Sequence, residues 1–405
     1  MEIMPILRAL RRNKVGAVLI ALQIAVTLAI ISNSLSMIQN RVQWMQRPSG
    51  IDEANIFAFR NTWSADPPDL KARIEADLAA LRSLPGVVDA EATNNTPLAG
   101  NEWHWPLAKG SDHQEFIAWA AIYTVDEHGL ATYGLNLIAG RWFSASEVGD
   151  IRIRETRFPP SIVVTQSVAK RLFPAGHALG QELYFEHAGS SRIVGVVEQM
   201  QRPSDAPNWG NPWAEYSILV PFQFLNNGLI YVVRTRAGQQ AAVMRAAPAR
   251  LFELTHERII QDVQSFSEIR SRAHRNNRAT VIMLAVLGTL LMAITAFGVI
   301  GLTMYWVGQR RRHIGLRRAL GARRGDILCY FHTENLLIAG TGCIVGVALG
   351  LAGNTWLAAR LEIARMSFGY ASVGALIVLA LCQLAVLWPA LRAASVPPAI
   401  ATRGL

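Results

Sequence analysis

Residues that could carry out chemistry are few in this sequence, and the first group lies in a hydrophilic stretch. It contains Glu102, His104, Asp112, His113 and Glu115, which are residue types that bind metal ions. Their spacing matches no known ligand pattern, and a solvated loop accounts equally well for so many polar residues. The sequence therefore predicts no metal site.

A second polar group, His332, Glu334 and Asn335, lies just before a long apolar run that starts at Leu336. Ionisable side chains within a membrane often relay protons or bind ions. A relay would need further ionisable residues deeper in the apolar run, and the sequence has none there. Proton-driven transport is therefore disfavoured.

Signatures of catalysis and nucleotide binding are absent from the sequence. It contains no GxxxxGK[ST] loop to cradle phosphates, and no HExxH, CxxC or GxSxG pattern. We therefore predict no catalytic, cofactor-binding or metal-binding residues, and a non-catalytic protein.

The composition indicates a membrane protein with one soluble part. Of the 405 residues, 51% are hydrophobic and only 17% are charged, whereas about 25% is usual for soluble domains. The apolar residues gather in four long runs, with a stretch of ordinary soluble composition between the first two.

The net charge of +10 raises the question of nucleic-acid binding. The densest basic clusters, however, flank apolar runs, which is typical of topology signals beside anionic lipid. They comprise Arg8, Arg11, Arg12 and Lys14 before the first run, and Arg310, Arg311, Arg312, Arg317, Arg318, Arg323 and Arg324 after the second. We therefore predict contact with membrane lipid and no nucleic-acid partner.

Four transmembrane helices are predicted, at residues 15–38, 279–307, 336–359 and 366–391. Each run exceeds the roughly 20 residues that cross the hydrocarbon core, and backbone groups in lipid must be satisfied within a helix. The first run could instead be a cleaved signal peptide. It is longer than the roughly 7–15 apolar residues of such a peptide, so a retained helix is favoured.

The bias of Arg and Lys predicts the orientation of the chain in a bacterial inner membrane. Residues 1–14, an amphipathic segment, and the loop at 308–335 are basic and should be cytoplasmic, as should the tail at 392–405. Residues 39–278 then form a large periplasmic domain. Four outer arginines oppose this rule (Arg270, Arg272, Arg275 and Arg278); we interpret them as a helical stalk that continues the second span.

The predicted periplasmic domain has mixed α and β character and contains no cysteine. Leu70, Ile74, Leu78 and Leu81 recur at helical spacing, and further helices are expected near residues 167–173 and 241–255. Short β-branched runs indicate strands starting at Val87 and at residues 161–165, 192–197 and 230–234. The fold class is therefore a four-helix membrane bundle with a large α+β extracytoplasmic domain of two lobes, interrupted in sequence.

Tryptophans are abundant in this domain, and most are expected to fill its cores. Four of them lie in loop-like segments and are candidates for a surface that binds substrate or an adaptor: Trp103, Trp105, Trp209 and Trp213.

Gly342, Gly346 and Gly350 recur every four residues in the third span. Small residues at this spacing allow two helix backbones to approach closely. The pattern fits packing within the bundle and also an interface between subunits, and packing is favoured because the motif is common in membrane bundles.

The segment RRRHIGLRRALGARRGDILCYFHTE, from Arg310 to Glu334, is the most informative part of the chain. It predicts a helix leaving the membrane, a break at Gly321, and a new helix capped by Asp326 whose first turn holds Ile327 and Leu328. A short helix on such a loop could dock onto another protein, or it could be a re-entry turn held by anionic lipid.

This segment resembles the RRREIGIRRALGAsxxDI pattern of the MacB/FtsX family of ABC transporter permeases. Here His313 replaces the usual Glu, which puts one contact with the ATPase in doubt. The start (ALRRNKVGAVLIALQIAVTLAI) and the end (WPALRAASVPPAIATR) are also similar to the family, although Ile400 stands where an acidic residue is usual. Phrases such as SLPGVVDA, YGLNLIAGRWFSASE and RIVGVVEQM extend the likeness, in order, through nearly the whole chain.

The resemblance implies a permease that pairs with a second, identical or related permease and with an ABC ATP-binding subunit supplied in trans. The residues implied to couple the permease to that ATPase are Arg317, Arg318, Gly321, Ala322, Arg323, Arg324, Asp326 and Ile327. ATP-driven closure of the ATPases would then be transmitted through the membrane helices to the periplasmic domains.

Three functions are consistent with the resemblance. The favoured one is export of an antibiotic, peptide or lipid-like molecule, with a periplasmic adaptor and an outer-membrane channel as further partners. The alternatives are a non-transporting, FtsX-like regulator of a periplasmic partner and lipoprotein release of the LolC/LolE kind. FtsX-like members have a much smaller outer domain, whereas LolC and LolE have one of similar size.

Overall fold

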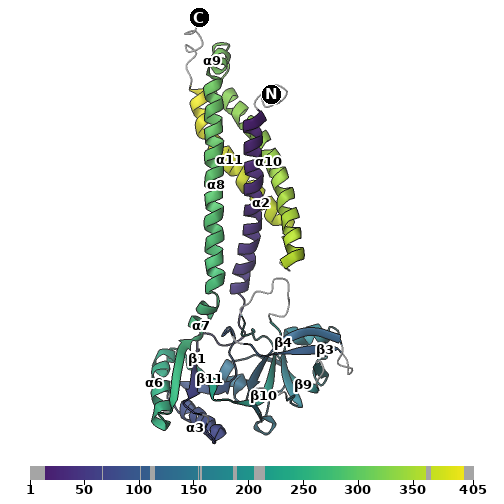
Figure 1. Ribbon diagram of the computed structural model, residues 1–405, viewed down its shortest axis with the longest axis vertical. Coiled ribbons are helices and arrows are strands. Elements are labelled where there is room, and N and C mark those ends of the chain that lie inside the picture. The colour runs from purple at the N-terminus through teal and green to yellow at the C-terminus, as the bar shows by residue number, and fades with distance from the viewer. Residues whose placement is uncertain are drawn as a thin grey trace. The chain divides into compact units, whose positions relative to one another are not determined.

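The computed structural model of the chain describes residues 14–65, 67–100, 102–109, 115–153, 155, 157–185, 189–204, 215–361 and 366–395. The chain forms two compact units (Figure 1). The membrane unit comprises Met1–Met45 and Asn277–Leu405, and the outer unit comprises Gln46–Asn276. In the sequence, the outer unit thus lies between the first and second long helices.

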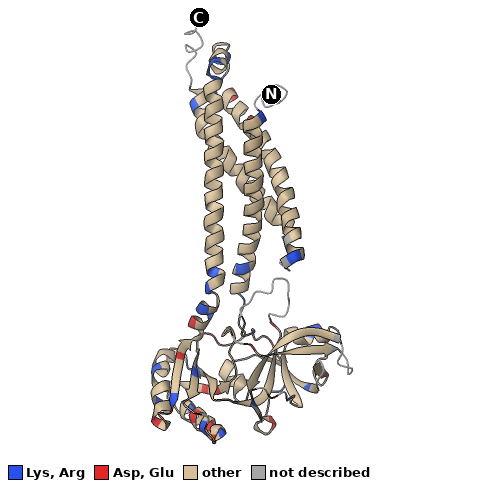
Figure 2. Cartoon of the chain, viewed as in Figure 1, with Lys and Arg blue, Asp and Glu red and all other residues tan. Residues whose placement is uncertain are grey.

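The membrane unit consists of long apolar helices joined by one short basic helix. The long helices are α2 (Lys14–Met45), α8 (Arg275–Gln309), α10 (Arg324–Leu361) and α11 (Phe368–Ala394), and the short one is α9 (Arg311–Ala319). Within the described residues, these four long helices are apolar enough to cross a membrane. Their charged residues lie near their ends (Figure 2), so the middle of the bundle suits hydrocarbon.

Helix α10 packs most closely on α2, and glycines make this approach possible. A Cβ atom added to Gly342 would lie 2.7 Å from the Ala21 carbonyl oxygen, and one added to Gly346 would lie 2.8 Å from that of Ala25. Such contacts are too short for real Cβ atoms, so both positions require glycine while the backbones stay this close. The glycine stripe therefore faces α2 of the same chain.

Helix α8 is more loosely attached, since only 6% of its most apolar window is buried, against 44% for α2. Polar contacts fix it to its neighbours within the unit. Asn277 accepts a hydrogen bond from Arg41, and the Thr27 and Thr295 hydroxyls lie 2.9 Å apart. Near its last turn it contacts α10, as described below.

The first lobe of the outer unit is a four-stranded sheet in the order β12–β1–β11–β2. Its strands are β1 (Ile56–Trp63), β2 (Val87–Thr93), β11 (Gly228–Thr235) and β12 (Arg258–Ser265), accompanied by α3 (Leu70–Arg82), α6 (Gln240–Leu254) and α7 (Phe266–Ala273). The side chains of Phe59, Ile74 and Leu251 are among those buried in its core.

The second lobe is an eight-stranded mixed sheet in the order β4–β3–β8–β9–β7–β10–β6, with β5 paired to β9. Its strands are β3 (His104–Lys109), β4 (Glu115–Val125), β5 (Leu137–Gly140), β6 (Gly149–Arg152), β7 (Ser161–Thr165), β8 (Glu182–Phe185), β9 (Ser190–Val197) and β10 (Ser217–Leu225). The short helices α4 (Gly129–Tyr133) and α5 (Gln166–Leu172) and the 3-10 turn η1 (Ala145–Glu147) connect them.

The predicted fold class is confirmed. The first lobe draws its strands from both ends of the outer unit, and the second lobe lies between β2 and β11 in sequence, so the α+β domain has two lobes and is interrupted. The predicted arginine stalk is wrong in part, because α7 ends before His274 and α8 starts at Arg275. Arg270 lies on α7 and forms an ion pair with Glu53 inside the outer unit.

Candidate functional site

The turn between α9 and α10 is formed by local hydrogen bonds that the sequence specifies. Gly321 has a φ of +97°, a left-handed conformation that favours glycine. Its N–H donates to the Arg318 carbonyl at 3.2 Å, and the Ala322 N–H donates to the Arg317 carbonyl at 3.0 Å. This pair of bonds is the Schellman motif. No atom lies within 4 Å of a Cβ added to Gly321, so backbone conformation alone requires the glycine.

Asp326 closes the other side of the turn. Its carboxylate accepts a hydrogen bond from the Arg323 backbone N–H at 2.9 Å, and its own N–H donates to the Arg323 carbonyl at 3.1 Å. The expectation that Asp326 precedes the helix is wrong. Helix α10 starts at Arg324, so Asp326 lies in its first turn. Its side chain still caps the helix, because it bonds to the backbone N–H of Arg323, the residue before the helix.

The turn presents an apolar surface of two leucines, one on α9 and one at its C-terminal cap, framed by arginines. Leu316 and Leu320, four residues apart, are 55% and 80% exposed, and basic residues gather on the same short helix (Figure 2). Ile314 and Ile327 are instead buried in the core of the membrane unit. Ile327 therefore anchors the loop, while Leu316 and Leu320 face outward.

A buried ion pair attaches the start of α9 to α10. Arg310, the residue before α9, places Nη1 at 3.0 and 2.9 Å from the two carboxylate oxygens of Glu334. The Glu334 side chain is only 2% exposed and that of Arg310 is 19% exposed. The same Nη1 donates to the Tyr330 hydroxyl at 3.1 Å, and the guanidinium lies 5.7 Å from the Trp306 ring centre. Four residues from α8, α10 and the joint between α8 and α9 thus form one constellation.

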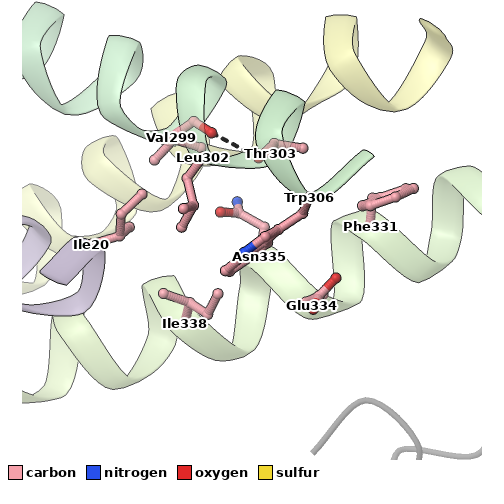
Figure 3. Close-up of a pocket in the computed structure, with 9 residues that line it drawn as sticks. All are labelled: Ile20, Val299, Leu302, Thr303, Trp306, Phe331, Glu334, Asn335 and Ile338. Atoms are coloured by element: carbon pink, nitrogen blue, oxygen red, sulfur yellow. Dashed lines mark hydrogen bonds between the residues drawn. The ribbon is translucent and has the colours of Figure 1, made fainter. Parts of the chain in front are cut away.

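This constellation borders a small pocket in which side chains of α2, α8 and α10 converge (Figure 3). Trp306 of α8 lies beside Glu334 and Asn335 of α10, and Ile20 of α2 closes one side. The accessible volume is about 10 Å³, roughly the space of one water molecule. The pocket is therefore part of a joint between helices, too small for an organic ligand.

The remaining predicted site residues lie in three environments. Arg323 and Arg324 are exposed on the turn, Ala322 and Arg318 are half-buried, and the Arg317 guanidinium lies 5.4 Å from the Tyr330 ring centre. A Cβ added to Gly350 would lie 3.4 Å from Ala29 Cα, an ordinary contact.

The four candidate tryptophans do not form one surface within the described residues. Trp105 is half-buried and packs on Phe158 and Phe185, whereas Trp103 lies edge-on to Phe224 and lines a cleft. Trp209 and Trp213 lie outside the described residues. Glu102, from the polar group weighed as a metal site, pairs with Arg202 at 2.6 Å.

The coupling residues predicted from the sequence did not include Leu316 and Leu320, and the Arg310–Glu334 pair was not predicted. The i, i+4 spacing of Leu316 and Leu320 was a usable signal, because it places both on one face of α9. The ion pair had a weaker signal, a single acidic residue at the edge of an apolar run.

Comparison with known proteins assigns the family. The MacB-like periplasmic core domain family matches residues 16–251, and the FtsX-like permease C-terminal family matches residues 285–398. The chain belongs to the MacB/FtsX-like permease family of ABC transporters. The curated macrolide export ATP-binding/permease protein MacB of Chromobacterium violaceum is 25% identical over 350 residues, covering 85% of this chain and 50% of that protein.

The permease is also similar to MacB of Escherichia coli strain K12, with 24% identity over 364 residues, or 88% of this chain and 52% of that protein. The chain thus spans about half the length of the curated relatives it matches. Among solved structures, the periplasmic region of MacB from Actinobacillus actinomycetemcomitans is 16% identical and covers 57% of this chain and 97% of that one, with a TM-score of 0.35.

Proposed function

We propose that this permease transmits the motion of a separate ABC ATP-binding subunit to its outer unit and thereby drives export of an antibiotic, peptide or lipid-like molecule. The outer unit would be periplasmic, both termini cytoplasmic, and a second permease, identical or related, would complete the transporter. A periplasmic adaptor and an outer-membrane channel are further proposed partners.

The exposed leucine pair of α9 is the observation that carries this proposal. Two leucines held outward on a rigid turn, with arginines around them, suit an apolar pocket with an acidic rim on another protein. The Gly321 turn and the Asp326 cap fix the direction of α9 relative to α10, and the Arg310–Glu334 pair joins it to both α8 and α10. A push on α9 would therefore reach two membrane helices at once.

The resemblance assigns the loop residues to coupling, and we propose a role for each that is compatible with this geometry. Gly321 and Asp326 would act by shaping the turn, Arg323 and Arg324 by contacting the ATPase, and Ile327 by anchoring the loop in the bundle. Arg317 and Arg318, on the last turn of α9, would extend the basic frame.

Replacing Leu320 with Glu tests the docking surface. We expect loss of co-purification with the ATP-binding subunit and at least tenfold weaker stimulation of its ATPase activity, since burying an unpaired carboxylate opposes binding. Leu254→Glu, at a position that is 44% exposed on α6 of the outer unit, is the matched control and should leave both unchanged. Normal stimulation in the Leu320→Glu variant would remove α9 as the docking element.

Cysteine labelling tests the proposed orientation. In a background that carries Cys329→Ser, Ser146→Cys in the outer unit should react with an impermeant reagent only from the periplasmic side. His313→Cys on α9 should react only from the cytoplasmic side. Both positions are exposed within their own units, so burial cannot explain a failure to react.

A further inference from the structure

The outer unit contains a cleft between its lobes that consists of two adjoining chambers. The larger, of about 320 Å³, is bordered by β1, β12, α7 and the loop after β2. The second, of about 250 Å³, is bordered by β1, β11, Trp103 and the end of β10. Arg60, Ala99 and Ile230 line both chambers, which therefore adjoin. The larger chamber is of the size that holds small organic ligands.

Backbone strain is concentrated at this cleft. Among the described residues, three non-glycine residues have a positive φ, and two of them, Leu98 at 65° and Asp262 at 53°, line the larger chamber. Such conformations are unfavourable for residues with a side chain and gather at sites where the surrounding structure holds them for a purpose. Leu98 is additionally held by its N–H, which donates to the Arg202 carbonyl at 3.2 Å.

Asp262 belongs to a β-bulge that opens the wall of the cleft. The pairing of β1 with β12 shifts from Ala58 opposite Gln264 to Arg60 opposite Gln261, which leaves one extra residue on β12. Bulges bend a strand and redirect its side chains, and they are frequent beside functional sites. The larger chamber therefore lies where β12 departs from regular pairing.

Arg60 places a positive charge in the cleft. It is exposed on β1 and lines both chambers, and its side chain makes no hydrogen bond or ion pair with the described residues. The other charged residues in the walls are paired: Asp262 with Arg272 at 3.4 Å and Glu102 with Arg202 at 2.6 Å. One guanidinium is thus left available to a ligand.

Apolar side chains extend from Arg60 in both directions. Ile230 and Ile269 lie in the larger chamber, and Trp103, Phe224 and Ile153 lie in the second, where Ile153 is 54% exposed. We propose that this cleft binds a small amphiphile with one acidic group, whose carboxylate, sulfate or phosphate pairs with Arg60 while its apolar body lies in the chambers. The identification of this amphiphile with the exported molecule rests on the proposed function. The binding of the amphiphile to the cleft does not depend on that function.

Protection of a cysteine placed in the cleft tests the proposal. The full chain with Cys329→Ser and Ala99→Cys, in micelles of a non-ionic detergent, is labelled with a neutral maleimide. Ala99 is exposed and lines both chambers. Decanoate should slow the labelling at lower concentration than decanol or decyltrimethylammonium, because only decanoate can form a charge-assisted bond with Arg60.

Variants of Arg60 identify the charge that matters. Arg60→Gln should raise the half-protecting decanoate concentration about tenfold or more and leave that of decanol unchanged, and Arg60→Lys should retain most of the protection. Equal protection of wild type and Arg60→Gln by decanoate would overturn the proposal. Equal slowing at Ser146→Cys, exposed on η1, would also overturn it, because the amphiphile would then act on the reagent and not in the cleft.

The coupling proposal and the cleft proposal fail separately in these experiments. The permease is labelled without its ATP-binding subunit, so absent protection leaves the role of α9 untouched. Conversely, the Leu320→Glu variant, expected to lose ATPase stimulation, should still be protected by decanoate at Ala99→Cys.

Discussion

The outer unit and the membrane unit each contain an arginine paired with a buried carboxylate beside a tyrosine and a tryptophan. In the outer unit, Arg258 donates from two nitrogens to the two Asp77 oxygens at 2.8 and 2.9 Å, and both side chains are 1% exposed. In the membrane unit, Arg310 uses a single nitrogen for both Glu334 oxygens, and its side chain is 19% exposed. The same residue types thus form a closed pair in one unit and a partly open one in the other.

The partners of each pair extend this difference. Tyr231 donates to Asp77 at 2.6 Å and thereby adds a third hydrogen bond to the carboxylate. Burial, reinforced by the charge of Asp77, keeps the pKa of Tyr231 well above its usual value, so the hydroxyl remains a donor. Tyr330 instead accepts from Arg310, so that within the described residues only the Arg310 guanidinium bonds to the Glu334 carboxylate. Two parallel N–H···O bonds reinforced by a further donor hold a pair of side chains most rigidly. The Arg258–Asp77 pair is therefore suited to keeping the outer unit rigid, and the Arg310–Glu334 pair to a joint that can move.

The largest effect is expected when the closed pair is broken. Arg258→Ala leaves the buried Asp77 carboxylate without its cation and should destabilise the outer unit by roughly 3–5 kcal/mol. Thermal unfolding, followed for the purified full chain, would measure this loss. Asp77→Asn should reduce stability less, because the amide oxygen still accepts from Arg258. If Asp77→Asn and Arg258→Ala reduced stability equally, the charge of the pair would not be what stabilises the outer unit.

An intermediate effect on stability and a larger effect on coupling are expected for the open pair. Glu334→Gln keeps an acceptor for Arg310 and should cost roughly 1–3 kcal/mol. If the pair is the joint through which α9 moves α8 and α10, stimulation of the ATP-binding subunit should fall much more than the stability loss explains. Thr295→Val is the matched control on α8, since it removes a neutral bond to Thr27 and should reduce stability by only about 0.6 kcal/mol.

The contrast between the pairs also shows what a sequence can and cannot predict. Local patterns were sufficient for α3, whose apolar residues recur at helical spacing, and for the glycine break after α9. Asp77 and Arg258 are 181 residues apart, and Arg310 and Glu334 are 24 apart on either side of a turn. No periodicity links such positions, because folding alone brings them together. The bulge at Asp262 likewise depends on pairing between β1 and β12.

The smallest effect on stability is expected at Glu91, a third buried carboxylate. Unlike Asp77 and Glu334, it has no hydrogen bond from an arginine within the described residues. One oxygen accepts from the Asp126 N–H at 2.9 Å, and the other has no hydrogen-bond partner. Burial raises its pKa well above the usual value, and the nearby Asp126 charge raises it further. Because the folded state holds this proton more tightly than the unfolded one, its contribution to stability is present below the ordinary pKa of 4.5 and declines as pH rises toward the raised value.

Glu91→Gln removes this titration and should therefore stabilise the chain at pH 8, by about 1 kcal/mol, with a difference that shrinks as the pH approaches 5. Melting temperatures of wild type and variant, compared across this range, measure the effect. Asp77→Asn should show the opposite sign at pH 8, since that carboxylate has a guanidinium and a phenol to stabilise its charge. If both substitutions destabilised the outer unit equally at every pH, the pairing of each carboxylate would not be what distinguishes them, and shape complementarity in the core would account for both.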